Sequence, residues 1–96
     1  MEKAHWKIQY NQKVDSEDIP RIDTKWWRDI EEAIRQKLGT DPFVFGKPLR
    51  HSLKGVRALR VGDYRVLYEI RHATVYIGAI KHRSFEYQAG IEERFA

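Results

Sequence analysis

The stretch RVGDYRVLYEI, residues 60–70, decides the fold because a two-residue turn separates its two strand-forming runs. A Gly-Asp pair between alternating apolar residues is a strong signal for a tight β-hairpin. If Gly62 and Asp63 form the turn, Arg60 lies directly opposite Arg65. Two opposed like charges destabilise a sheet by up to about 1 kcal/mol. Folding alone gives no reason for this pair, so we expect it to hold an anion.

Residue parity separates the two faces of this hairpin, because successive side chains of a strand point to opposite sides. The predicted apolar face carries Leu59, Val61, Tyr64, Val66, Tyr68 and Ile70. The two arginines share the other face with Ala58, Leu67 and Glu69. A phosphodiester is the candidate anion for the pair. The alternatives are that Glu69 or an acid of the first long helix neutralises both cations, or that both side chains extend into water.

A third strand follows the hairpin. The run TVYIGAIK, residues 74–81, can return through a turn at His72-Ala73 and continue an antiparallel meander. Strict alternation predicts that this strand adds to the apolar face Val75, Ile77 and Ala79.

The N-terminal half predicts one strand and two helices. WKIQY, residues 6–10, alternates apolar and polar side chains as a half-buried strand does. Residues 11–22 predict a short helix that ends before Pro20. Residues 24–38 predict a longer helix that ends at Gly39, with one apolar face made of Trp27, Ile30, Ile34 and Leu38.

Residues 40–56 predict a long surface loop, and the last residues a short C-terminal helix with Phe85, Tyr87, Ile91 and Phe95 in rough helical spacing. Together the elements predict one α+β domain, residues 1–96: an antiparallel β-sheet with an N-terminal strand, two N-terminal helices packed on one face, and the C-terminal helix.

Composition excludes several classes of function. The chain has no cysteine, which excludes disulfides and thiolate metal sites and favours a cytoplasmic location. The longest apolar stretch, residues 75–80, is far shorter than the ~20 residues of a membrane span. The four histidines lack metal-ligand spacing, and the chain has no glycine-rich phosphate loop or nucleophile elbow. We therefore expect no metal, no cofactor and no membrane partner.

Charge is segregated along the chain. Residues 46–83 contain nine basic and two acidic residues, a charge of +7, and the rest of the chain carries −3, which sum to the net charge of +4. A basic segment of this kind favours a polyanionic partner, either nucleic acid or an acidic protein segment.

Two motifs carry a family resemblance. LRVGDYRVLYEI, within residues 53–70, and the HR pair followed four residues later by tyrosine, within residues 75–87, make the chain similar to the RelE/ParE superfamily. These proteins are toxins of type II toxin–antitoxin systems. The resemblance implies the RelE-like microbial RNase fold and a ribosome-dependent, metal-independent mRNA endoribonuclease that inhibits translation. It implies catalytic roles for Arg65, Arg83 and Tyr87.

The chain departs from the RelE pattern where the strand before the turn usually carries alternating cations, because Val56 and Ala58 stand there. Lys54, Arg57, His51 or His82 can substitute for these cations. The group that transfers protons stays open, and His82 is a candidate because imidazole is a common general acid or base. Strict alternation places His82 on the basic face, and Arg83 would take that place only if the chain bulges near Lys81. The candidates for holding RNA are Lys47, Arg50, Lys54, Arg57, Arg60 and Lys81.

The resemblance also leaves two other functions open. The first is a ParE-like inhibitor that acts on DNA gyrase by binding, and the second is a catalytically degenerate member that binds only RNA or its antitoxin. The implied partners are a cognate antitoxin protein and mRNA on the ribosome, with DNA reached only through the antitoxin complex.

Overall fold

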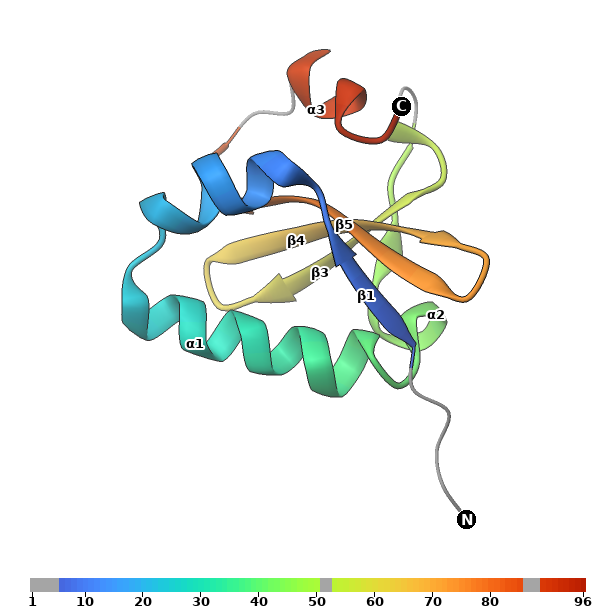
Figure 1. Ribbon diagram of the computed structural model, residues 1–96, viewed down its shortest axis with the longest axis horizontal. Helices are drawn as coiled ribbons and strands as arrows, with labels where there is room; N and C mark the ends of the chain where they lie inside the picture. The colour runs from blue at the N-terminus through green and yellow to red at the C-terminus, as the bar shows by residue number, and fades with distance from the viewer. Residues whose placement is uncertain (1–5, 51–52, 86–88) are drawn as a thin grey trace.

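The centre of the molecule is a five-stranded sheet (Figure 1). The computed structural model describes residues 6–50, 53–85 and 89–96. The strands are β1 (Lys7–Tyr10), β2 (Lys47–Pro48), β3 (Val56–Val61), β4 (Tyr64–Arg71) and β5 (Thr74–His82). Their order is β1-β5-β4-β3-β2, and all neighbours are antiparallel except β1 and β5, which run parallel. The predicted meander is confirmed, and β1 joins it at the β5 edge.

The hairpin of β3 and β4 has the predicted register, with Arg60 opposite Arg65. Gly62 in its turn has a φ of +58°, a left-handed conformation that glycine adopts without steric penalty. A Cβ at Gly62 would also lie 2.5 Å from the ring of Trp26. The turn therefore needs glycine both for its backbone and for the close approach of the helix that carries Trp26.

The helical segments lie mainly on one side of the sheet. They are η1 (Val14–Asp18), η2 (Ile19–Arg21), α1 (Thr24–Ala33), η3 (Ile34–Leu38), α2 (Pro42–Phe45) and α3 (Ala89–Glu93). The predicted long helix is α1 continued by the π-helical turn η3, and Gly39 follows it. The side chain of Asp23 caps α1 by accepting a hydrogen bond from Lys25 N–H at 2.9 Å.

Two predictions for this half are wrong in detail. The helical segment does not end before Pro20, because η2 begins at Ile19 and proline is tolerated in the first turn of a helix. Residues 40–56 are not only a loop, because they contain α2 and β2. Asp41 caps α2, and β2 pairs with β3.

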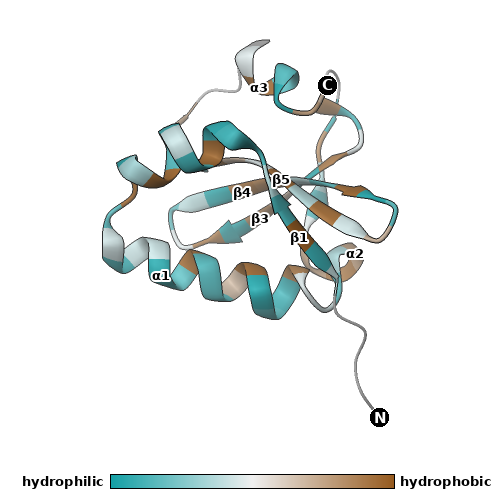
Figure 2. Ribbon diagram, in the orientation of Figure 1, coloured by the Kyte–Doolittle hydropathy of each residue, from teal (hydrophilic) through white to brown (hydrophobic). Residues whose placement is uncertain are grey.

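The main core lies between the apolar face of the sheet and the helices. In Figure 2, hydrophobic segments recur along α1 between hydrophilic ones, as expected for a helix with one buried face. The cluster contains Val14, Ile22, Ile30, Ile34, Leu38, Leu59, Val66, Tyr68, Val75, Ile77 and Ile80. Burial of these side chains is the dominant favourable term in folding.

A β-bulge in β5 changes which residues share a face. Leu67 pairs with Ala79, whereas the next residue, Tyr68, pairs with Ile77, so Gly78 is an extra residue. The prediction that Ala79 joins the apolar face is therefore wrong, and Ile80 takes that place.

Beyond the bulge, Lys81 lies opposite Arg65 and His82 lies opposite Tyr64. The prediction that alternation puts His82 on the basic face is wrong for the same reason. His82 instead shares the helix-covered face, and Lys81 joins the arginines.

The C-terminal segment, residues 89–96, covers part of the opposite face of the sheet. In Figure 1, α3 lies at the top of the view and α1 runs along the bottom, below the strands. This second, smaller core contains Leu53, Val56, Leu67, Ala79 and Ile91, with Phe85 and Phe95 packed against it. The face that carries the cations is therefore closed at one end and open at the hairpin turn.

Candidate nucleic-acid interface

Three cations occupy neighbouring positions on adjacent strands. Arg60 of β3 pairs with Arg65 of β4, and Arg65 pairs with Lys81 of β5, so all three project from the same face. Neighbouring strands lie about 4.8 Å apart, so Arg60 and Arg65 are close enough together to contact one phosphate or two successive ones. We call Arg60, Arg65 and Lys81 the basic row.

A fourth cation lies next to the basic row. Lys47 of β2 pairs with Ala58 of β3, and both are therefore on the same face as Arg60. Ala58 is one of the two positions where the RelE pattern usually has a cation. Lys47 is exposed and brings a positive charge beside that position from a neighbouring strand.

The ammonium group of Lys81 is held by a buried carboxylate. Its Nζ lies 2.9 Å from Oδ1 of Asp18 and 4.7 Å from the ring centroid of Phe85. Asp18 also accepts hydrogen bonds from Ile80 N–H at 2.9 Å and from the Arg94 guanidinium at 2.7 Å. The positive charge of Lys81 is thus largely balanced inside the protein.

Asp18 lies at an edge of the sheet where β5 has backbone N–H groups without a strand partner. β1 pairs only with Thr74 to Ile77 of β5, so the N–H groups of β5 beyond the bulge have no strand partner on that side. A buried N–H group without a partner is costly, and the Asp18 carboxylate supplies the acceptor. The same carboxylate fixes Lys81 and, through Arg94, the C-terminal segment.

Arg83 lies next to the hairpin turn. Its backbone N–H donates to the Asp63 carbonyl at 2.7 Å, and its Nε lies 3.5 Å from Oδ1 of Asp63. Both side chains are more than half exposed, and an exposed ion pair contributes at most about 1 kcal/mol. Arg83 is therefore positioned near the open end of the basic face but can exchange Asp63 for another anion at little cost.

His82 lies on the other face from Arg65, and its ring orientation is defined. Its Nδ1 accepts from Ser84 N–H at 3.2 Å and lies 2.8 Å from Ser84 Oγ. In the neutral ring this leaves the proton on Nε2, so His82 presents a donor to its surroundings. Its ring contacts Tyr64 edge to face, with centroids 5.4 Å apart.

The remaining predicted residues are dispersed. Arg57 is on the helix-covered face, where its guanidinium donates to the carbonyls of Phe43 at 2.8 Å and Gly46 at 2.6 Å. Its contacts thus hold the α2 segment. Arg50 and Lys54 are exposed. Tyr87 and His51 lie outside the described residues.

Glu69 does not serve as the neutralising acid for the arginine pair. Its carboxylate accepts from Nε of Arg71, two residues along the same strand. Within the described residues no cluster of three histidine, cysteine or carboxylate side chains is arranged for a metal ion. In the same part of the chain, no helix has the length and apolarity needed to cross a bilayer.

Sequence reasoning missed Asp18 and Arg94 as contributors to this region, and it named Lys47 as a candidate for holding RNA without predicting its position beside Ala58. Asp18 and Lys81 are far apart in sequence, as are Arg94 and Asp18. Lys47 lies beside Ala58 because a two-residue strand forms in a segment whose sequence predicts a loop. No local pattern signals such pairings, because they depend on how distant elements pack.

Comparisons with known proteins support the family resemblance. Residues 13–87 match the family model described as ParE toxin of type II toxin-antitoxin system, parDE. The chain is 38% identical over 73 residues to Toxin RelE of Mycobacterium tuberculosis, covering 74% of this chain and 75% of that protein. It is 43% identical over 73 residues to Toxin RelG of the same organism, covering 74% and 84% of the two chains.

Solved structures agree with this. The toxin–antitoxin complex RelBE2 from Mycobacterium tuberculosis contains a chain with a TM-score of 0.77 and 28% identity, covering 88% of this chain and 98% of that one. The YoeB–YefM complex from Staphylococcus aureus matches in fold, with a TM-score of 0.57 and 18% identity over 88% of this chain and all of that one. The chain belongs to the RelE/ParE superfamily and is the toxin of a type II toxin–antitoxin system.

Proposed function

We propose that this toxin inhibits translation by cutting mRNA on the ribosome in a metal-independent reaction. The observation that supports the proposal is the basic row, in which Arg60 and Arg65 lie side by side and Lys81, whose charge Asp18 balances, continues the row on the third strand. Lys47 extends the positive charge on the same face. A phosphodiester backbone is the anion that a row of closely spaced cations suits best.

Metal-free RNA cleavage requires three actions at one phosphate. The 2′-OH attacks the neighbouring phosphorus, so one group must take a proton, another must give one, and a third must stabilise the added negative charge. Arg65 is the central cation of the row, and we assign it to the phosphorane. Arginine stays protonated at neutral pH, so this charge is present throughout the reaction.

The other proposed groups come from the end of β5 and the residues after it. Arg83, held loosely by Asp63, contacts the phosphate or the leaving group. Tyr87 stacks on a base or moves a proton. His82 lies on the other face of β5 from Arg65, so we assign it no proton transfer at this phosphate. Arg60, with Lys47, Arg50 and Lys54, binds the RNA backbone, whereas Lys81 and Arg57 are already engaged by protein acceptors.

The cognate antitoxin is the protein partner expected of a toxin in such a system. We propose that an acidic antitoxin segment covers the basic row and so competes with mRNA for the same cations. The cytoplasm, where ribosomes and mRNA are found, is the proposed location.

Mapping of mRNA ends on programmed ribosomes tests the function. Toxin that has been treated with EDTA and then dialysed before it is added to the ribosomes should cut mRNA in the A site as fast as untreated toxin. Arg65→Ala should lower the cleavage rate by a factor on the order of 10² to 10³, as for the loss of one transition-state charge stabiliser. Arg28→Ala, an exposed arginine of α1 on the other side of the sheet, is the matched control and should cleave as the wild type does.

A ParE-like gyrase inhibitor is the second candidate, because the matching family model is named for ParE and the usual cations are missing at Val56 and Ala58. An assay of DNA supercoiling by gyrase distinguishes the two functions. Inhibition of supercoiling by both the wild type and Arg65→Ala, with intact mRNA on ribosomes, would overturn the nuclease proposal. If Arg65→Ala and Arg83→Ala both cleave ribosome-bound mRNA as the wild type does, the catalytic roles assigned to these residues are wrong.

A further inference from the structure

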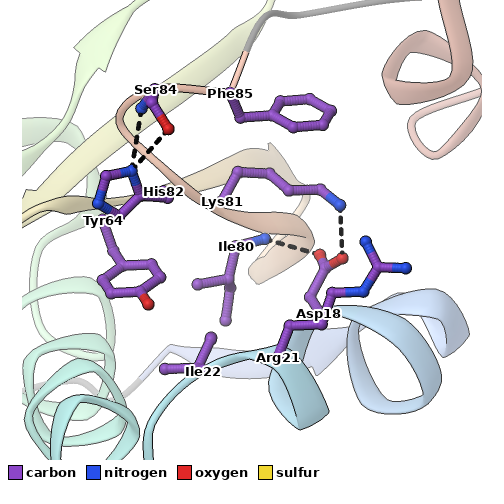
Figure 3. A pocket seen from close by; sticks show the side chains of 9 residues that line it. All are labelled: Asp18, Arg21, Ile22, Tyr64, Ile80, Lys81, His82, Ser84 and Phe85. Carbon is purple, nitrogen blue, oxygen red and sulfur yellow. Dashed lines mark hydrogen bonds and ion pairs between the residues drawn. The ribbon is translucent and has the colours of Figure 1, made fainter.

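A cavity of about 220 Å³ lies beside the basic row, at the junction of η2 with the end of β5. Figure 3 shows the side chains of Tyr64, His82, Phe85 and Arg21 around it. Lys81 contributes to the cavity wall and also belongs to the basic row. The cavity and the proposed phosphate site therefore share one residue.

The walls of the cavity are rich in rings. Tyr64 and His82 are packed edge to face, with ring centroids 5.4 Å apart, which holds both planes in place. The Phe85 ring is held by Lys81, whose Nζ lies 4.7 Å from its centroid. Single-stranded RNA is recognised largely by stacking of its bases on aromatic side chains and on arginine planes.

The cavity also offers polar groups for the edge of a base. Among the described residues, neither the Arg21 guanidinium nor the Tyr64 hydroxyl has a hydrogen-bond partner. Arg21 is exposed at the rim, and Tyr64 is half-buried. A guanidinium provides donors, whereas a phenol can donate or accept, so both kinds of base edge can be matched.

The floor of the cavity carries no unbalanced negative charge. Asp18 lines it, but its carboxylate is bound by Lys81 at 2.9 Å and by Arg94 at 2.7 Å. Repulsion of an incoming nucleotide by this acid is therefore small. The combination of ring walls, free polar groups and an adjacent cationic row fits one class of ligand.

We propose that this cavity receives a nucleobase of the mRNA substrate, from a nucleotide next to the phosphate that the basic row binds. The inference rests on the proposed function and adds a specificity site to it. Stacking on Phe85 and contact with Arg21 hold the base, and the Tyr64 hydroxyl contributes to the choice between bases.

Abasic scanning of the mRNA tests this proposal. The cleavage site of the wild-type toxin is first mapped on a programmed ribosome, and each nucleotide of the A-site codon is then replaced in turn by an abasic one. One abasic position should lower cleavage by the wild type roughly tenfold, the scale of one lost base–aromatic stack. Phe85→Leu, which keeps apolar volume, and Arg21→Ala should lower cleavage of intact mRNA.

The decisive comparison combines both changes. On the mRNA that is abasic at the sensitive position, Phe85→Leu and Arg21→Ala should cleave at the wild-type rate, because the group that they contact is already gone. At the other two positions, the rate reduction caused by the abasic nucleotide and the reduction caused by the substitution should multiply. Arg28→Ala should match the wild type on every mRNA, and unchanged thermal unfolding of Arg21→Ala excludes a folding defect.

Three results would overturn the inference. Deficits that multiply at all three positions would show that no base contacts these residues. Variants that cleave every mRNA as the wild type does, but bind antitoxin less tightly, would identify a protein side chain as the occupant. A wild-type toxin that cuts no ribosome-bound mRNA would remove the proposed function itself, which separates that failure from failure of the cavity alone.

Discussion

Tyr10, which is half-buried, and Tyr68, which is buried, show how the surroundings of a single residue set its chemistry. Burial, followed by the charges of Glu31 and Asp15, raises the pKa of Tyr10 to about 12. Burial also raises the pKa of Tyr68, although the nearby Arg57 guanidinium opposes the rise. The Tyr68 hydroxyl donates to the Pro42 carbonyl at 2.6 Å and so ties the sheet to α2. Neither phenol is available as a base at neutral pH.

The raised pKa of Tyr10 predicts a loss of stability in alkali. A folded-state pKa above the unfolded value of 10.0 means that folding favours the protonated phenol, so its stabilising contribution is complete below pH 10 and falls as the pH rises towards 12. Tyr10→Phe cannot ionise. The free energy of unfolding of the wild type, measured in urea, should fall relative to that of Tyr10→Phe between pH 10 and 12 and run parallel to it between pH 7 and 9. Parallel curves up to pH 12 would contradict the shift.

At the scale of elements, the bulge in β5 organises the candidate site. Without the extra residue Gly78, alternation would place His82 rather than Lys81 beside Arg65. The bulge also sits beneath the C-terminal segment, because the Gly78 carbonyl accepts from Arg94 at 3.3 Å and the Phe95 ring covers the glycine. The bulge thus aligns the basic row and provides the surface on which the segment after α3 packs.

A side chain at Gly78 should lift this segment. A Cβ there would lie 2.2 Å from Cζ of Phe95, so either the ring or the strand must move. Gly78→Ala should destabilise the protein by about 1 to 3 kcal/mol, the usual range for overpacking. In a Phe95→Ala background the same change should cost much less, because the clashing ring is absent.

Urea unfolding of the four proteins in this cycle measures the coupling. Hydrogen exchange of the backbone amides in residues 91–96 should rise in Gly78→Ala and be no higher in the double variant than in Phe95→Ala. Additive free energies in the cycle would show that Phe95 does not limit the space at position 78.

At the scale of the whole molecule, charge and shape act together. The excess of positive charge lies in residues 46–83, and the sheet built from this segment presents the basic row on one face while helices cover the other. The C-terminal segment closes only part of the basic face. The open, cationic end of the sheet is therefore suited to contact a polyanion.

This arrangement predicts a salt-dependent association. Binding to ribosomes programmed with an mRNA that carries a 2′-deoxy nucleotide at the cleavage site should weaken linearly in log Kd against log salt. Arg60→Ala should weaken binding and reduce that slope by about one, as expected for one lost phosphate contact. Arg28→Ala, with the same change of net charge on the helical side, should leave the slope unchanged. Equal slopes for both variants would show that Arg60 contacts no phosphate.

The sequence by itself determined the hairpins, the helix of residues 24–38 and the opposed arginines. These features are local: a two-residue turn sets the register of its strands, and a 3.6-residue period sets the buried face of a helix. The placement of Arg60 opposite Arg65 therefore followed from counting outward from Gly62-Asp63.

Only the tertiary structure decided which other cations join that pair. Lys81 entered the row because β5 bulges at Gly78, and Lys47 came beside Ala58 because β2 pairs with β3. Arg57 donates hydrogen bonds to carbonyls of the α2 segment, and Asp18 accepts a hydrogen bond from the unpaired edge of β5. The physical reason is that steric fit under Phe95 and the need of buried N–H groups for acceptors arise between residues distant in sequence, where no local pattern records them.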